Sequence, residues 1–145
     1  MKSFFLKTNI LALTAGMVFF VSACLSSPQE IAADLSPAEL IQRAQEASDR
    51  NRYALALRYY ETILERYASN IDLVCAAEYE IAFIHYKQKK YEIAREKFNA
   101  LLARYNTPDE ELLPQQFKKL ARIVLERITE KEKPRRFFRK KAAGA

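Results

Sequence analysis

This 145-residue chain has two cysteines, Cys24 and Cys75, and a single histidine, His85, and both residue types can act as nucleophiles or bases. A cysteine or serine hydrolase needs a histidine to activate its nucleophile and a third group to orient that histidine. His85 lies three and four residues after Ala82 and Ile81, which is the spacing of one helix face, and Cys75 is followed by two alanines. These settings favour a packed histidine over a general base, and a small buried cysteine over a reactive thiol.

Other catalytic patterns are missing from the sequence. It contains no metal-ligand spacing, no glycine-rich phosphate loop and no nucleophile elbow. Carboxylates are common, but they alternate with Lys and Arg along predicted helices, as on solvated faces. We therefore predict a protein that is not an enzyme, with no catalytic residue and no metal site.

Cys24 stands at the end of an export leader. Lys2 and Lys7 precede a twelve-residue apolar run over 10–21, which is too short to cross a bilayer and fits the core of a signal peptide. The run ends in Val-Ser-Ala before Cys24, and this pattern resembles the bacterial lipoprotein box. The resemblance implies a helical signal peptide over 1–23 and a mature chain whose first thiol carries diacylglycerol. The alternative is a plain secretory signal with an incidental Cys24.

The same resemblance implies an address in the bacterial cell envelope. Leu25 follows the cysteine, where an Asp would favour the inner membrane, so we expect an outer-membrane lipoprotein that faces the periplasm. With Cys24 acylated, Cys75 has no intramolecular disulfide partner, and the covalent lipid is the only expected cofactor. Residues 24–36 lack sustained periodicity and include Ser-Ser-Pro, so we predict a lipidated tether there.

A sequence repeat indicates the helices that would position any functional surface. A shift of 38 residues lays Tyr91, Ala94 and Phe98 on an earlier, matching triplet. The earlier triplet of this packing signature consists of Tyr53, Ala56 and Tyr60. Apolar residues three and four apart lie on one face of a helix, and small residues that alternate with large ones suit helix-on-helix packing. A fixed period of this length indicates one supersecondary unit that occurs twice.

Start and stop signals divide the repeat region into helices. Ser36-Pro37 with Glu39 forms a capping box, and we expect four helices over about 37–48, 53–68, 74–86 and 91–105. With no Trp and only two Gly, the composition also favours helix. The predicted fold is all-α: an α-solenoid of two helical hairpins and a C-terminal capping helix, over 37–131.

The repeat signature, with Ala44 and Ala82 at the small position of each first helix, resembles the tetratricopeptide repeat (TPR) family. A lipoprotein box followed directly by such hairpins, each ending in Arg-Tyr, is similar to the BamD (YfiO)-like outer-membrane assembly lipoproteins. This resemblance implies a TPR scaffold for protein–protein interactions, whose partner is an outer-membrane β-barrel assembly protein. The alternative is an unrelated TPR lipoprotein that serves a transport system or binds partners at the cell surface.

The candidate partner-binding groove lies on the first helix of the second repeat. Tyr79, Phe83 and Tyr86 are spaced by four and three residues and form an aromatic stripe, and Lys87 follows them. We expect this stripe to be partly exposed and to bind a peptide or a partner helix. The alternative is that it packs against a third pair of helices.

The last segment is strongly basic. An amphipathic capping helix is expected after Pro114, ending near Glu130, and residues 132–145 form a predicted disordered tail. The sharper alternative for this tail is contact with anionic headgroups or an acidic protein through Phe137 and Phe138. The whole chain has a formal charge of +6, or +4 without the two leader lysines, an excess too small to indicate nucleic acid.

Overall fold

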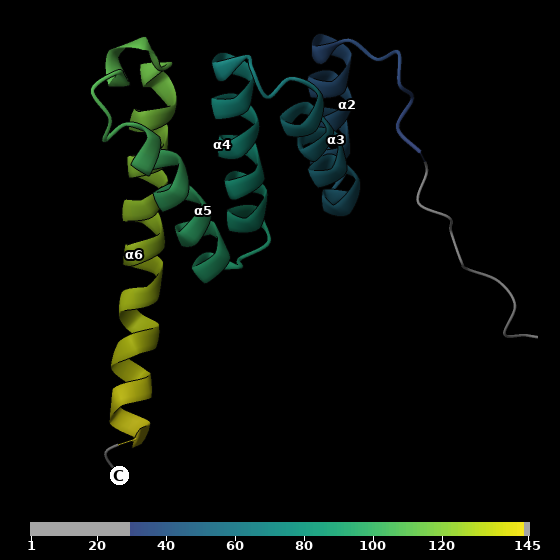
Figure 1. The fold of residues 1–145 in the computed structure, drawn as a ribbon. Helices are drawn as coiled ribbons and strands as arrows, with labels where there is room; N and C mark the ends of the chain where they lie inside the picture. The colour runs from purple at the N-terminus through teal and green to yellow at the C-terminus, as the bar shows by residue number, and fades with distance from the viewer. Residues whose placement is uncertain (1–29, 144–145) are drawn as a thin grey trace, which may run out of the picture. The chain divides into compact units, whose positions relative to one another are not determined.

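A computed structural model describes the backbone of residues 30–143 and the side chains of residues 30–133. The signal peptide, Cys24 and the side chains of the basic tail lie outside these residues. A compact unit begins at Ile31, and its described part is helical, without strands, which confirms the all-α prediction (Figure 1). The elements are α2 (Pro37–Asp49), α3 (Tyr53–Arg66), α4 (Ile71–Lys87), α5 (Tyr91–Arg104), the short 3-10 helix η1 (Glu110–Leu112) and α6 (Gln115–Ala143).

Side-chain caps fix the start of the first helix of each pair. The Ser36 hydroxyl accepts a bond from the Glu39 amide at 3.4 Å, and the Glu39 carboxylate accepts one from the Ser36 amide at 2.9 Å. The Ser36 hydroxyl also donates to the Glu39 carboxylate at 2.7 Å, and this bond, together with the one from the Ser36 amide, lowers the pKa of Glu39. Asn70 caps α4 in a similar way by accepting from the Leu73 amide at 3.2 Å. Both devices satisfy amides that have no partner inside the helix.

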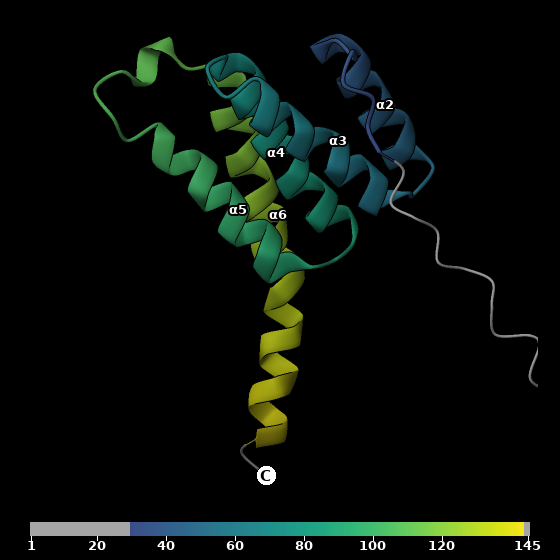
Figure 2. The same cartoon turned by 45° about the vertical axis from the view of Figure 1, so that its right-hand side comes forward.

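A left-handed residue makes each sharp turn between paired helices. Asn51 has φ 57° in the turn from α2 to α3, and Lys89 has φ 61° in the turn from α4 to α5. The two positions are 38 residues apart, so the sequence repeat extends to backbone conformation. The turns place α3 against α2 and α5 against α4, and we call these pairs hairpin one and hairpin two (Figure 2).

The repeated small and large residues form the cores of the two hairpins. Ala56 and Tyr60 are buried in the core of hairpin one, and Ala94 and Phe98 are buried in hairpin two. The small residues of the first helices, Ala44 and Ala82, are also fully buried. The 38-residue period is therefore a repeat of packing as well as of sequence.

The hairpins stack through α3 and α4, and α6 packs on α5 and α4 (Figures 1 and 2). The first core cluster is shared by α2, α3 and one face of α4, and the second by the other face of α4, α5 and α6. Helix α4 thus takes part in both clusters, which explains why its apolar residues are not confined to one stripe.

The expected tether over 24–36 is shorter than predicted, because Ile31–Leu35 is docked on hairpin one. The Arg66 guanidinium donates to the carbonyls of Ala32 at 2.9 Å, Ala33 at 3.2 Å and Ile31 at 3.2 Å. The side chain of Leu35 is buried in the first core cluster. A segment held by these bonds and by apolar packing does not act as a free linker.

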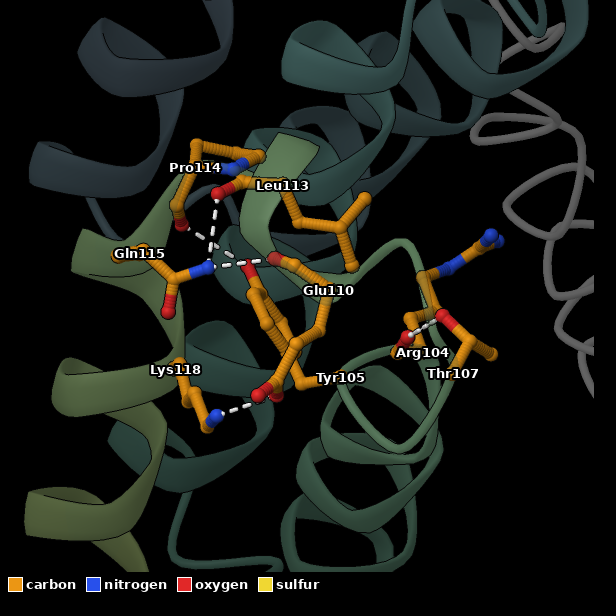
Figure 3. A network of polar contacts seen from close by, with 8 residues as sticks. All are labelled: Arg104, Tyr105, Thr107, Glu110, Leu113, Pro114, Gln115 and Lys118. Atoms are coloured by element: carbon orange, nitrogen blue, oxygen red, sulfur yellow. Dashed lines mark hydrogen bonds and ion pairs between the residues drawn. The ribbon is translucent and has the colours of Figure 1, made fainter.

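A polar network shapes the connection between α5 and α6 (Figure 3). The buried Tyr105 donates its hydroxyl to the Pro114 carbonyl at 2.9 Å, and Gln115 donates to the carbonyls of Glu110 at 2.6 Å and Leu113 at 3.1 Å. Lys118 forms an ion pair with the Glu110 carboxylate at 2.6 Å. These contacts fix the start of α6, which lies just after Pro114 as predicted.

Helix α6 continues beyond the expected end near Glu130 and reaches Ala143, in place of a disordered tail from 132. Arg, Lys and Ala have high helix propensity, and they make up most of residues 135–143. Glu132 is buried in an ion pair with Arg95 of α5, so packing also extends past the predicted end. A capping helix at the end of a repeat array is expected to have a polar outer face. The outer face of α6 is less polar than that, since Leu120 and Ile123 are exposed.

Candidate partner-binding surface

The aromatic stripe is ordered by ring contacts along α4. Tyr79 stacks on Phe83 with centroids 5.9 Å apart, and Phe83 stacks on Tyr86 at 5.7 Å. Tyr79 also meets Phe98 of α5 and Phe117 of α6, each at 5.6 Å. Burial raises the pKa of Tyr79, with a smaller contribution from the Glu80 carboxylate.

The stripe is therefore divided between core and surface. Tyr79 is only 7% exposed and fills the space between α4, α5 and α6, so it corrects the prediction of an exposed groove residue. The alternative is packing on a third pair of helices, and for Tyr79 the single helix α6 takes that place through Phe117. Phe83 and Tyr86 are half-buried, and the ring of Tyr86 also lies 5.9 Å from the ring of Tyr91, centroid to centroid.

Lys87 joins the two hairpins and is not a free groove lysine. Its ammonium donates to the Ser48 hydroxyl at 2.7 Å and lies 5.7 Å from the Tyr53 ring and 6.0 Å from the Phe83 ring. A lysine held by a buried hydroxyl and two rings stabilises the stacking of hairpin two on hairpin one. The sequence does not predict this contact, because Ser48 and Lys87 are far apart along the chain.

Glu80 lies in the same interface. Burial raises the pKa of its carboxyl, Lys87 opposes that shift, and the nearby Asp49 adds to it. Burial, Glu80 and Asp49 also raise the pKa of Tyr60 on α3. A half-buried carboxyl in a helix interface gives the stacking a dependence on pH.

Cys75 and His85 have the structural settings that the sequence predicts. Cys75 is fully buried, and burial raises the pKa of its thiol, so little reactive thiolate forms. His85 is half-buried, its Nδ1 has no hydrogen-bond partner within the described residues, and its pKa is lowered by burial and by the charges of Lys97 and Lys90. No nucleophile is paired with it in this part of the chain.

A small open cavity that the sequence analysis missed lies where the second half of α2 meets the first half of α3. It has a volume of about 130 Å³ and is lined by Arg43, Arg50 and Arg52, among others. Leu55 and Tyr59 form an apolar wall, and Ala47 and Glu46 complete the lining. We call it the arginine cavity. The sequence does contain a signal for this cavity. Arg50 and Arg52 flank the turn residue Asn51, and Arg43 lies seven residues, about two helical turns, before Arg50.

Two further features of the described residues bear on function. None of the helices in this part of the chain is both long enough and apolar enough to cross a bilayer. Residues 30–133 also hold no group of His, Cys, Asp or Glu side chains that is arranged to bind a metal ion.

Comparison with known proteins gives one informative match. The chain is 37% identical over 113 residues to an uncharacterized protein of Treponema pallidum (strain Nichols). The match covers 77% of this chain and 45% of the relative, so this chain spans a little under half of that protein's length. No family model matches the sequence, and no solved structure matches it.

Proposed function

We propose that this protein is a TPR-type scaffold lipoprotein of the outer membrane, which binds other proteins and serves the assembly of β-barrel proteins. One observation carries the scaffold part of the proposal. The signature positions of the sequence repeat, Ala56 with Tyr60 and Ala94 with Phe98, have the same buried role in two stacked hairpins. Repeats of this kind stack into extended concave surfaces that bind partners.

The docked segment supports a role close to the membrane. If Cys24 carries the lipid, six residues separate it from Ile31, where the folded unit begins. At ~3.5 Å per residue, a fully extended connection of this length reaches only about 25 Å. The scaffold would then remain beside the bilayer surface, where nascent barrel proteins insert. The barrel-assembly partner itself rests on the sequence resemblance.

The lipid anchor is tested by metabolic labelling with palmitate. We expect the chain to be labelled and to fractionate with the outer membrane, and Cys24→Ser to remove both properties. The Cys75→Ser variant is the matched control, since a buried thiol is not a lipidation site. An unlabelled protein in the soluble fraction would contradict the anchor.

The partner is tested by photo-crosslinking in intact cells. A photoreactive residue at Phe83 or Tyr86 should capture a barrel-assembly protein, whereas the same residue at the exposed Glu61 of α3 should not. Capture of a transporter component, or cleavage of the chain by protease added outside the cells, would support the alternative lipoprotein role and contradict the proposal.

A further inference from the structure

The arginine cavity has the composition of a binding site more than that of a structural contact. The side chains of Arg50 and Arg52 make no hydrogen bond or ion pair with any other residue of the described part. Arg43 lies near the Glu39 carboxylate, and Glu46 accepts a bond from Gln42 at 3.1 Å. Three arginines and one glutamate therefore line an open space beside an apolar wall.

Arg52 is also unfavourable for the helix that it precedes. It holds the N-cap position of α3 and provides no side-chain cap, at a position where Ser, Thr, Asp or Asn would satisfy a free amide. A cation at this end of a helix is opposed by the helix dipole as well. Local stability does not explain an arginine there, whereas recognition of an anion does.

The corresponding positions of hairpin two are basic only in part, because Arg43 and Arg50 correspond to Ile81 and Gln88, whereas Arg52 corresponds to a lysine. A shift of 38 residues lays Arg52 on Lys90, Tyr59 on Lys97 and Ala47 on His85. Lys90 is again an N-cap residue without a side-chain cap. The charges of Lys97 and Lys90 both contribute to lowering the pKa of His85, after burial, so the two lysines provide positive charge on this side of hairpin two.

The two basic places lie at the same end of the hairpins. Each is next to the turn that joins the two helices of its hairpin, and both turns are at the lower end in Figure 1. The chain enters at the opposite end of hairpin one, where Ile31 is bound by Arg66 at the end of α3. Helix α2 has 13 residues and separates the two ends by about 20 Å.

We propose that these paired basic places bind an extended acidic segment of a partner protein, with a carboxylate in the arginine cavity and another beside Lys90 and Lys97. Arg presents a fork of donors that suits a carboxylate, and Leu55 with Tyr59 offers a wall for the methylenes of a Glu side chain. Three arginines against Glu46 give the lining a formal charge of +2, which complements an anionic side chain. The inference rests on the proposed function only in that the ligand is a protein.

The spacing of the two places predicts the spacing of the acidic residues. Neighbouring helix layers are about 10 Å apart, so equivalent points of adjacent hairpins are about 10–20 Å apart. An extended chain advances ~3.4 Å per residue, so carboxylates about three to six residues apart can reach both places.

The test uses the full chain in detergent and a fluorescein-labelled dodecapeptide with Glu at every third position in a Ser/Gly background. Fluorescence anisotropy should show binding that weakens about tenfold in Arg50→Gln/Arg52→Gln, by a similar factor in Lys90→Gln/Lys97→Gln, and further in the quadruple variant. The matched control is Arg122→Gln/Arg127→Gln on the exposed face of α6, which removes the same charge and should change affinity less than about twofold. Circular dichroism confirms that each variant folds.

Several results would overturn the inference. One is that a peptide with Gln in place of Glu binds as tightly as the Glu peptide. Another is that the α6 control variant weakens binding as much as the cavity variants do. The third is that the Glu peptide does not bind at physiological salt. Vesicles of phosphatidylglycerol that lose binding in the cavity variants, while the peptide does not, would assign the site to lipid headgroups. If Cys24 proves to carry no lipid, the envelope function is contradicted. The acidic-segment site still stands in that case if the peptide binds.

Discussion

At the scale of single residues, the two turns show that equivalent positions of the repeat can differ in conformational strain. Asn51 and Lys89 occupy the same left-handed conformation, at φ 57° and φ 61°. Asn tolerates this region because its short polar side chain bonds locally, whereas a long side chain such as Lys does so at a cost. Hairpin one therefore has the better turn residue, although the turns are otherwise alike.

This difference gives a direct prediction. Lys89→Asn should stabilise the protein by about 0.5 kcal/mol, and Lys89→Gly by up to ~1 kcal/mol, because both relieve a strained φ. Chemical denaturation measures the change in unfolding free energy. The reverse exchange, Asn51→Lys, is the control and should destabilise by a similar amount. Equal stability of all three variants and the parent would show that the turns carry no strain.

The second residue-scale prediction concerns Glu80. Its folded-state pKa is raised, chiefly by burial and further by Asp49, so the folded protein binds this proton more tightly than the unfolded chain does. The unfolding free energy contributed by Glu80 is therefore highest at low pH and falls as pH rises through the raised pKa.

Glu80→Gln should remove this fall in stability. Thermal melts at pH 4 and pH 7 should show that the melting temperature of the variant, relative to the parent, is higher at pH 7 than at pH 4. Glu96→Gln, at an exposed position of α5, is the control and should leave the pH dependence unchanged. A constant difference across this range would mean that Glu80 is solvated in the folded protein.

At the scale of elements, the sequence predicts what local rules determine. The capping box at Ser36, the two signature triplets and the break at Pro114 each depend on residues within about one or two turns, and the observed helix starts agree with them. The misses come from long-range contacts. Nothing local reveals that Arg66 binds Ile31, or that Tyr79 meets Phe117. The sequence spacing predicts the aromatic stripe on α4, but the burial of Tyr79 depends on the placement of α6.

Arg66 gives the prediction at this scale. Arg66→Ala should release Ile31–Leu35 from hairpin one and lower the unfolding free energy by ~1 kcal/mol, since its three hydrogen bonds are partly exposed. Amide exchange over 31–36 should become faster while exchange in α4 and α5 stays the same. Glu65→Ala, at the neighbouring exposed position, is the control. Unchanged exchange at 31–36 would show that Leu35 packing alone holds the segment.

At the scale of the whole molecule, stability is divided between two core clusters that α4 shares. Leu40 is buried in the cluster of hairpin one, and Phe98 in the cluster of hairpin two and α6. In a stacked array each unit contacts only its neighbours, so the two ends can open separately. The contact of Lys87 with Ser48 and the packing of α3 on α4 set how strongly the two ends are coupled.

Two large-to-small substitutions measure that coupling. Leu40→Ala should cost about 2–5 kcal/mol and Phe98→Ala about 3–5 kcal/mol, because both side chains are fully buried. Hydrogen exchange with mass spectrometry should show faster exchange mainly in α2 and α3 for the first variant, and mainly in α5 and α6 for the second. Leu112→Ala removes a side chain that is 77% exposed and should change neither. Uniformly faster exchange in both core variants would mean that the hairpins unfold as one cooperative unit, in which case the stacking at α3 and α4 dominates the stability of the fold.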